Sequence, residues 1–246
     1  LHLRRGEEDL SGLALLPLFL STRAGVRALV TADLAHELAL KNSMKERGQA
    51  LDWFRASIGL LKTAPPVLVC IGGLSGSGKS TLAAALAPEL GAAPGALHVR
   101  SDVERKVLAG VAETERLPPV SYSREASFAV YTGSFGRAER ALRAGHSVVL
   151  DAVFARQDER RSAAEVARRT GAHFAGLWLE APADLLIARV NARTGDASDA
   201  TADVVARQVA YDLGRIDWQR VDAAGSPAET LARVREMLPF RSAAPS

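Results

Sequence analysis

The sequence has few of the residues that mark specialised protein classes. Among 246 residues there is one cysteine, aromatic residues make up 5%, and glycine and proline number 20 and 11. These proportions exclude a disulfide scaffold, a collagen-like repeat and low-complexity disorder. Because Cys70 lies within an apolar run, we expect it to be a small core residue of a protein in a reducing, cytoplasmic compartment.

Long apolar runs are also missing. The apolar stretch 13–20 is interrupted by Pro17 and is much shorter than the roughly 20 residues that cross a bilayer, so we expect no membrane association. Arg4 and Arg5 precede this stretch as in a signal peptide, but three acidic residues follow them at 7–9 and disfavour that interpretation. Because the sequence begins with Leu1 rather than methionine, we expect it to be part of a longer protein.

The chain has no large excess of charge of one sign. Its net charge is +3, and dividing it at Lys62 gives +2 and +1 for the two parts. Neither part has the basic excess expected of a protein that binds an extended nucleic-acid backbone. A local basic patch is still compatible with these charges.

Histidine and tryptophan are scattered along the chain. The histidines lack metal-ligand spacing, so we expect them at the surface or at strand edges. They are His2, His36, His98, His146 and His173. We expect Trp53, Trp178 and Trp218 to pack in the core rather than to form a base-stacking platform.

The sequence divides near residue 63. In 25–40 and 49–61 apolar residues recur three and four positions apart, which predicts that 1–62 is helical. Pro65 and Pro66 end this helical run, because proline disfavours the helical conformation of the residue before it. We therefore expect a helical segment over 1–62 and a second domain over 63–246, with a frayed tail at 242–246.

Beyond residue 63, short apolar runs alternate with longer helical patterns. The predicted strands are 67–71, 96–99, 147–150, 174–179 and 219–221. The predicted helices are 79–90, 103–109, 125–144, 158–170, 183–193, 200–213 and 228–238. This alternation predicts an α/β fold with a parallel sheet flanked by helices, and such sheets bind ligands beyond the carboxyl ends of their strands.

A glycine-rich motif follows the first predicted strand. Residues 73–80 read Gly-Leu-Ser-Gly-Ser-Gly-Lys-Ser, which fits the phosphate-binding P-loop pattern between a strand and a helix. Its backbone N–H groups and the helix N-terminus can surround an anion, Lys79 can bridge the β- and γ-phosphates, and Ser80 can ligate Mg²⁺. The predicted ATP-binding residues are Gly73, Ser75, Gly76, Ser77, Gly78, Lys79, Ser80 and Thr81. The alternative is a glycine-rich turn that caps a helix.

The surrounding sequence separates the classes of P-loop protein. A guanine-specific Asn-Lys-x-Asp segment is missing, which disfavours a GTP switch. Asp151 ends the third predicted strand and is a candidate carboxylate on the Mg²⁺ side. Ala152 follows it, where motor ATPases usually have a glutamate that polarises water. Water is therefore not the obvious nucleophile.

Asp102 follows the second predicted strand and is a candidate general base. A carboxylate there can accept the proton of an acceptor hydroxyl, and Arg105, one helical turn further, can orient that acceptor. The alternative is that Ser101 or Asp102 caps the helix.

Arginines in two later helices are candidate phosphate ligands. Arg189 and Arg193 lie four residues apart and can stabilise the charge of phosphoryl transfer, or they can belong to a solvated face. In the turn that follows, Ser198 or Asp199 can cap the next helix. After Asp151, three further arginines can contact a phosphorylated acceptor or form a solvated helix face. They are Arg156, Arg160 and Arg161.

Together these motifs resemble the small P-loop kinases that include phage polynucleotide kinase, zeta toxins and chloramphenicol phosphotransferase. The resemblance covers 66–238 and rests on Gly-Ser-Gly-Lys-Ser, Asp102 with Arg105, the Val-Val-Leu-Asp ending at 151, and Arg189 and Arg193 before Asp-Ala-Ser-Asp-Ala-Thr. It is greatest to bacterial predicted kinases fused behind an aminoglycoside-phosphotransferase-like domain. Residues 13–27 also resemble the last helices of that upstream domain, which implies that 1–62 is the end of such a fused or associated domain.

The resemblance implies a site in which Asp102 is the general base, Arg105 contacts the acceptor and Arg193 is a lid arginine on the transferred phosphoryl group. It places Asp151 on the acceptor side or beside the metal. We therefore expect an ATP- and Mg²⁺-dependent kinase that phosphorylates a hydroxyl of a small molecule or of a nucleic-acid end. Lys79, Asp102 and Arg193 would be its catalytic residues. The alternative is a nucleotide-dependent regulatory or binding module with slow ATP hydrolysis.

Overall fold

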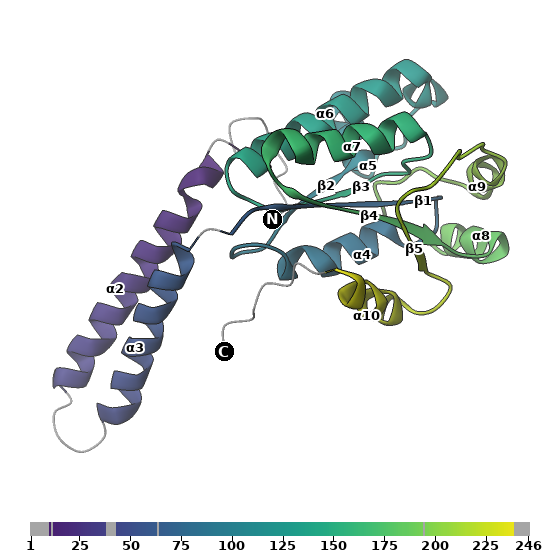
Figure 1. The fold of residues 1–246 in the computed structure, drawn as a ribbon. Coiled ribbons are helices and arrows are strands. Elements are labelled where there is room, and N and C mark those ends of the chain that lie inside the picture. Colours follow the sequence, from purple (N-terminus) through teal and green to yellow (C-terminus); the bar gives the residue numbers. More distant parts are fainter. Residues whose placement is uncertain (1–9, 11, 38–42, 63, 194, 239–246) are drawn as a thin grey trace.

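The computed structural model describes residue 10 and residues 12–37, 43–62, 64–193 and 195–238. In this part of the chain five strands form one parallel sheet in the order β2-β3-β1-β4-β5 (Figure 1). The strands are β1 (Val67–Gly73), β2 (Leu97–Arg100), β3 (Val148–Asp151), β4 (His173–Glu180) and β5 (Gln219–Asp222). The predicted parallel sheet flanked by helices is confirmed.

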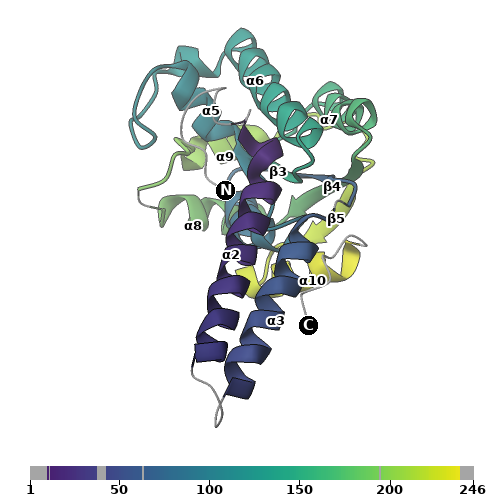
Figure 2. The same cartoon turned by 90° about the vertical axis from the view of Figure 1, so that its left-hand side faces the viewer.

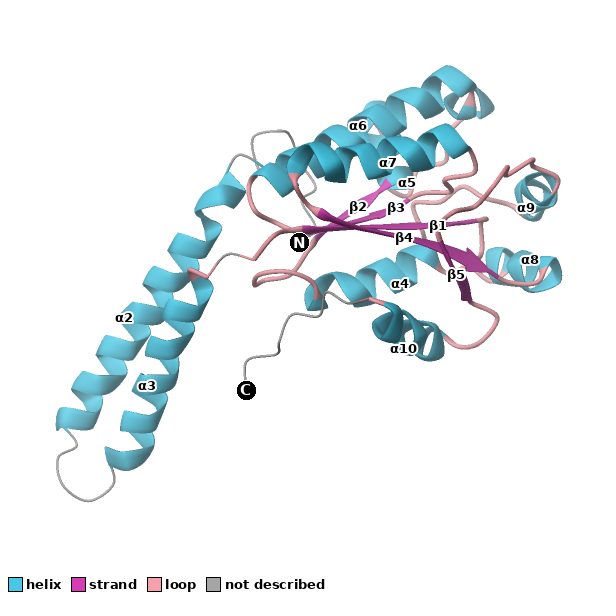
Figure 3. Ribbon diagram, in the orientation of Figure 1, coloured by secondary structure: helices cyan, strands magenta, loops and turns pink. Residues whose placement is uncertain are grey.

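Helices cover both faces of the sheet (Figure 3). The helices that follow the first strand are α4 (Lys79–Leu86), α5 (Ser101–Leu108), α6 (Arg124–Arg143), α7 (Gln157–Thr170), α8 (Ala183–Asn191), α9 (Ala202–Val209) and α10 (Pro227–Met237). Side chains of α6 and α7 pack on one face, and side chains of α4 and α10 pack on the other. Two short 3-10 helices lie in the connections: η2 (Ala87–Glu89) follows α4, and η3 (Pro119–Tyr122) precedes α6.

Strand β1 lies at the centre of the sheet and is buried along its whole length. This position explains its uninterrupted apolar sequence, because a central parallel strand is covered on both faces. Cys70 is fully buried there, as predicted, and burial raises the pKa of its thiol well above the usual range. Trp178, in β4, is buried, and Trp218, which directly precedes β5, packs edge-on against Phe154 at a ring-centroid distance of 4.8 Å.

Near the N-terminus two helices form a hairpin that projects away from the sheet (Figures 1 and 2). They are α2 (Leu16–Glu37), which follows η1 (Gly12–Leu15), and α3 (Ser43–Leu60). Ser21 donates a hydrogen bond to the Ser57 carbonyl and joins the two helices, with 2.8 Å between the oxygens. At the base of the hairpin Leu13 packs in the core, and its carbonyl lies 2.8 Å from Nε2 of His146.

Much of the hairpin surface is apolar. Large exposed side chains on these two helices are Leu18, Phe19, Val26, Leu29, Val30, Leu34, Met44, Leu51, Trp53, Phe54 and Ile58. One helix of the described residues, Gly12–Glu37, is long and apolar enough to cross a membrane by length and composition, and 22% of its apolar window is buried. Core helices of other proteins meet the same criteria, so a single such helix is weak evidence for a membrane span.

The remaining differences from the sequence predictions are local. Helix α2 begins at Leu16 rather than at the predicted residue 25. Pro17 does not prevent this earlier start, because it falls in the first turn, where a missing N–H costs no helical hydrogen bond. Helix α4 ends at Leu86 because Pro88 falls in the 3-10 turn that follows it. Trp53 is 39% exposed beneath the Arg27 guanidinium, so the prediction that it packs in the core is wrong.

The histidines are divided between surface and interior. His36 and His173 are exposed, whereas His98 and His146 are buried. The tail 242–246 and His2 lie outside the described residues.

Candidate active site

The P-loop connects β1 to α4 in a conformation that requires glycine. Gly73, Gly76 and Gly78 have φ values of +140°, +84° and +89°, a region that other L-residues rarely adopt. A Cβ atom at Gly76 would lie 2.4 Å from the carbonyl oxygen of Leu186 in α8. At Gly78, by contrast, a Cβ would meet no atom within 4 Å. The loop therefore packs tightly against α8 on one side and faces open space on the other.

This open side has the features of a phosphate site. Helix α4 begins at Lys79, so its first N–H groups have no acceptor within the helix, and its dipole favours an anion there. Ser77 Oγ is buried beside Gly73 and has no hydrogen-bond partner in the described part of the chain, and neither residue lines the pocket described below. The backbone N–H of Ser75 donates to Oε1 of Gln208 in α9 at 2.8 Å, which fixes the start of the loop.

Lys79 is the first residue of α4, and its side chain reaches back to the start of the loop. Its Nζ donates a hydrogen bond to the Leu74 carbonyl at 2.9 Å. Burial lowers the pKa of Lys79 from its usual value, while the carboxylates of Asp151 and Asp102 oppose that change. A bound phosphate would add negative charge beside this ammonium group and favour its protonated form.

Asp151, at the end of β3, lies beneath the P-loop serine. Its Oδ1 accepts a hydrogen bond from Ser80 Oγ at 3.2 Å, and its Oδ2 lies 2.6 Å from Nε2 of His98 in β2. A hydroxyl and a carboxylate are oxygen donors of the kind Mg²⁺ prefers, and Mg²⁺ in nucleotide sites usually takes only one or two ligands from the protein. These two side chains therefore fit the predicted metal site. Asp151 is buried and is not among the residues that line the groove described below.

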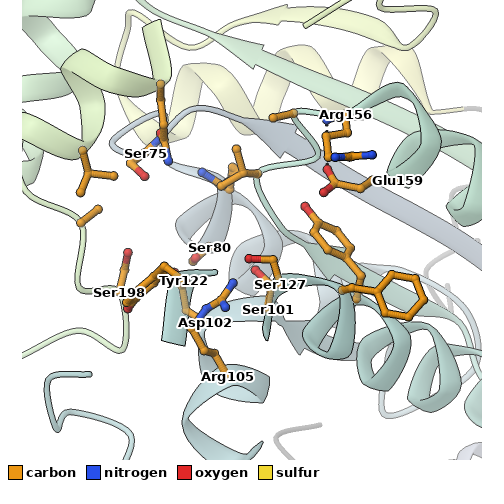
Figure 4. Close-up of a pocket in the computed structure, with 18 of the residues that line it drawn as sticks. Ser75, Ser80, Ser101, Asp102, Arg105, Tyr122, Ser127, Arg156, Glu159 and Ser198 are labelled. Atoms are coloured by element: carbon orange, nitrogen blue, oxygen red, sulfur yellow. Dashed lines mark hydrogen bonds between the residues drawn. The ribbon is translucent and has the colours of Figure 1, made fainter. Parts of the chain in front are cut away.

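Asp102 lies in the first turn of α5, where its side chain is not used as a cap. The N-cap residue is Arg100, and no side chain caps this helix, so the capping alternative for Ser101 or Asp102 is wrong. One turn further, Arg105 donates to the Ser121 carbonyl at 2.6 Å and lies over the Tyr122 ring at 4.7 Å. Asp102, Arg105 and Tyr122 lie together at one side of a pocket, and Arg156 and Glu159 lie at the other (Figure 4).

This pocket is a groove of about 1720 Å³ that extends from the P-loop between α6 and α7. It exceeds the roughly 300–1,000 Å³ of a typical small-molecule site, so there is room for a nucleotide and an acceptor together. Beyond Asp102 its walls carry Ser127, Phe128, Tyr131 and Glu159. Burial raises the pKa of the Glu159 carboxyl.

Arg193 lines the groove near the P-loop, whereas Arg189 does not. The Nε of Arg193 lies 3.4 Å from the Asp196 carboxylate. The guanidinium of Arg189 instead donates to the carbonyls of Ala223, Ala224 and Gly225, after β5. The structure thus brings Arg193 and not Arg189 toward the phosphate loop.

The three arginines that follow Asp151 differ in their contacts. Arg160 is buried and donates to the carbonyls of Phe154, Ala155, Leu213 and Arg215, so it joins the strand end to the segment before β5. Arg156 pairs with Asp158, and Arg161 is exposed at the groove. For Arg160 both sequence-based alternatives are wrong, because it neither faces an acceptor nor lies on a solvated helix face.

Several polar residues of the site were missed by sequence reasoning. They are His98 beside Asp151, Arg100 on Asp196 at 2.7 Å, Gln208 on the P-loop, and Lys106 on Asp199 at 2.7 Å. Asp199 does not cap α9, whose N-cap residue is Thr201. The signal in the sequence was two aspartates three residues apart directly after Arg193, but only the fold shows which side chains they contact.

Comparison with known proteins is consistent with this geometry. Residues 68–212 match the model of a family described as an AAA domain, AAA_33. Over 172 residues the chain is 35% identical to the uncharacterized protein Rv2004c of Mycobacterium tuberculosis H37Rv, which covers 67% of this chain and 33% of that protein. The chain thus spans about a third of the length of the curated relatives it matches.

Solved structures share the fold at low sequence identity. A sugar kinase from Janibacter sp. HTCC2649 superimposes with a TM-score of 0.53 and 21% identity, over 72% of this chain and 96% of that one. The tunicamycin resistance protein of Deinococcus radiodurans superimposes with a TM-score of 0.51 and 15% identity, over 73% and 99% of the two chains. Because residues 68–212, more than half of its length, match the family model, the chain belongs to the AAA_33 family of AAA domains.

Proposed function

We propose that this protein is an ATP- and Mg²⁺-dependent kinase that transfers the γ-phosphoryl group to a hydroxyl of a small molecule. The observation that carries the proposal is the carboxylate of Asp102, which does not cap α5 and faces the same groove as the P-loop. The carboxylate that ATP-hydrolysing motor proteins usually have directly after the strand-end aspartate is replaced here by Ala152, so the carboxylate that faces the groove follows β2 instead. The resemblance to small P-loop kinases supports the same assignment.

The P-loop would hold the phosphates of ATP. The backbone N–H groups at the start of α4 and the Lys79 ammonium would contact the β- and γ-phosphates. They would stabilise the negative charge of the phosphates because the fold holds these positive groups in place. Mg²⁺ would be held by Ser80 and Asp151 and would neutralise charge on these phosphates. His98 would keep the Asp151 carboxylate aimed at Ser80.

Asp102 would act on the acceptor. The oxygen of the acceptor hydroxyl bonds to the γ-phosphorus, and the bond between that phosphorus and the β,γ-bridging oxygen breaks, so that ADP leaves. The hydroxyl proton passes to the Asp102 carboxylate. Arg105 and Tyr122 would orient the acceptor, and Arg193 would approach the transferred group to stabilise its charge.

A small acceptor is favoured over a nucleic-acid end. The groove walls pair arginines with carboxylates, as in Arg156 with Asp158 and Arg169 with Glu139, so little uncompensated positive charge faces a polyanion. Serines, a tyrosine and an exposed phenylalanine suit a hydroxyl-bearing molecule. The sugar kinase of the same fold makes sugars and polyols the first class to test.

The test is ADP release from MgATP with a panel of sugars, polyols and a 5′-hydroxyl oligonucleotide. With an active acceptor, we expect Asp102→Asn to lower turnover about a hundredfold or more while ATP binding is retained. Lys79→Ala serves as the control that removes phosphate binding. Unchanged turnover in Asp102→Asn would refute its role as a base, and stimulation by the oligonucleotide alone would identify a nucleic-acid kinase.

We propose further that the α2–α3 hairpin packs against an aminoglycoside-phosphotransferase-like domain of the same protein. Support comes from the exposed apolar side chains of the hairpin, from its position outside residues 68–212, and from the greater length of the relatives. In the chain as given, Phe19→Ser with Leu29→Ser should leave the thermal stability of the kinase domain unchanged and reduce binding of a hydrophobic dye. A fall in its melting temperature would mean that the hairpin surface belongs to the kinase domain.

A further inference from the structure

The carboxylate of Asp199 joins three segments that are far apart in the sequence. It accepts hydrogen bonds from Lys106 Nζ at 2.7 Å, from Tyr122 OH at 2.6 Å and from the backbone N–H of Leu117 at 3.0 Å. Lys106 lies in α5, one turn beyond Asp102. Leu117 and Tyr122 belong to residues 111–122, here called the α5–α6 segment, and both line the groove. Asp199 itself belongs to residues 195–201, the α8–α9 segment.

In the ion pair at the centre of this junction the lysine is buried and the aspartate is part-buried. Lys106 is 1% exposed, which makes it one of the most deeply buried large side chains of the described residues, and it also donates to the Glu115 carbonyl. Removing two charges from water is costly, and an apolar pair of similar volume is often at least as stable. Such a pair is better explained by the fixed position that it gives to two loop segments than by a gain in stability. Its partners outweigh burial and hold the pKa of Asp199 below its usual range, so the carboxylate is charged at neutral pH.

The other end of the α8–α9 segment is held on the nucleotide side. The Asp196 carboxylate lies 2.7 Å from Arg100 and 3.4 Å from Arg193, and Arg100 Nε lies 4.0 Å from Asp151. The segment thus carries one carboxylate beside the residues that face the phosphates and another beside the residues that face the acceptor. In Figure 4, Ser198, between the two aspartates, lies at the same end of the pocket as Tyr122 and Asp102.

We propose that Asp199 is a positioning residue that couples the two substrate sites, so that occupation of the nucleotide site and order in the acceptor segment depend on each other. This inference rests on the proposed function. A ligand on the P-loop fixes Arg193 and the α8–α9 segment, and Asp199 passes that restraint to Tyr122 and Leu117. Coupling acts in the other direction as well: an acceptor that contacts Tyr122 and Arg105 favours the position of Arg193 that suits phosphoryl transfer. A water molecule is too small to contact Tyr122 and Arg105 in this way and does not favour that position.

Hydrogen–deuterium exchange with and without MgAMPPNP tests the coupling without knowledge of the acceptor. In the wild-type chain, MgAMPPNP should slow exchange in the P-loop and also in residues 111–122, the latter by about fivefold or more, as expected for coupled sites. In Asp199→Asn the P-loop should stay protected while the effect on 111–122 falls below about twofold. Asp199→Glu, which keeps a carboxylate, should restore part of the effect. Asp203→Asn removes the same charge from an exposed position on α9 and should behave as wild type.

Asp199→Asn leaves a buried lysine without its charged partner and could therefore unfold the protein. A second variant distinguishes loss of coupling from loss of the fold. Lys106→Met with Asp199→Leu removes both charges and should fold, bind MgAMPPNP and lose the protection of 111–122. If 111–122 is not protected in the wild type, or stays protected in this double variant, the coupling is refuted and the proposed function stands. If MgAMPPNP does not protect the wild-type P-loop, the proposed function fails, and the inference fails with it.

Discussion

Alanine substitutions at two glycines of the P-loop separate backbone strain from steric contact. Gly76 and Gly78 share a left-handed conformation, with φ of +84° and +89°, so alanine at either should cost about 1–2 kcal/mol of unfolding free energy. At Gly78 nothing lies within 4 Å of the added Cβ. At Gly76 the Cβ would lie 2.4 Å from the Leu186 carbonyl oxygen and 3.0 Å from its carbon, which no side-chain rotation relieves. Overpacking of this kind costs a further ~1–3 kcal/mol.

The assay is urea unfolding without nucleotide, so that lost phosphate contacts do not enter the comparison. We expect Gly78→Ala to lower the unfolding free energy by about 1–2 kcal/mol and Gly76→Ala by about 2–5 kcal/mol. Since α8 must move to accept the methyl group at Gly76, this variant should also bind MgADP more weakly once binding is corrected for the folded fraction. Equal destabilisation by the two substitutions would refute the view that close contact with α8 shapes the loop.

Two further predictions concern the buried charges. Arg160→Met should lower the unfolding free energy by about 2–4 kcal/mol because four carbonyls lose a charged donor. The control is Arg161→Met at the exposed neighbouring position, which should change the unfolding free energy by less than about 0.5 kcal/mol. Urea unfolding of both variants measures the difference. Because its partners lower the pKa of Asp199, the ionised carboxylate should stabilise the fold above the unfolded-state pKa of about 3.9, and this contribution should disappear as the pH falls through the folded-state pKa. The difference in unfolding free energy between the wild type and the double variant Lys106→Met, Asp199→Leu should therefore change as the pH falls below about 4. A difference that stays constant from pH 7 to pH 3 would contradict this prediction.

The sheet and the phosphate loop could be predicted from the sequence because both depend on local patterns. A buried parallel strand is a short apolar run, and the loop needs glycine at positions where the backbone is left-handed. All five predicted strands overlap observed strands, and Lys79, Ser80, Asp102 and Asp151 all lie near the carboxyl ends of β1, β2 and β3. This follows from topology, since parallel strands present their carboxyl ends at one edge.

Contacts between distant segments could not be predicted in the same way. Asp199 was assigned a capping alternative because aspartate before a helix is usually a cap, yet its partners are 82 and 93 residues away at Leu117 and Lys106. Arg160 and Arg161 are neighbours of identical type, and only the packing of α7 decides that the first is buried. Apolar residues usually lie in the core, but of the described residues only the Arg27 guanidinium is recorded over the Trp53 ring, which stays 39% exposed.

The two aspartates of the site lie in contrasting environments. Asp151 is buried, and both of its oxygens contact neighbours, Ser80 and His98, so the protein has fixed its orientation before any ligand arrives. Asp102 is part-exposed in the first turn of α5, does not cap that helix, and faces the groove. A carboxylate whose oxygens are already engaged suits a metal ion, which needs fixed donors, whereas one that faces an open pocket suits a proton transfer, which needs access to the acceptor. Pairs of carboxyl groups held in contrasting environments commonly take different roles in one reaction. The same contrast explains why Ala152, rather than a water-polarising glutamate, can follow Asp151: in the proposed reaction the nucleophile is activated by Asp102, at the start of α5, next to the end of β3 in the sheet.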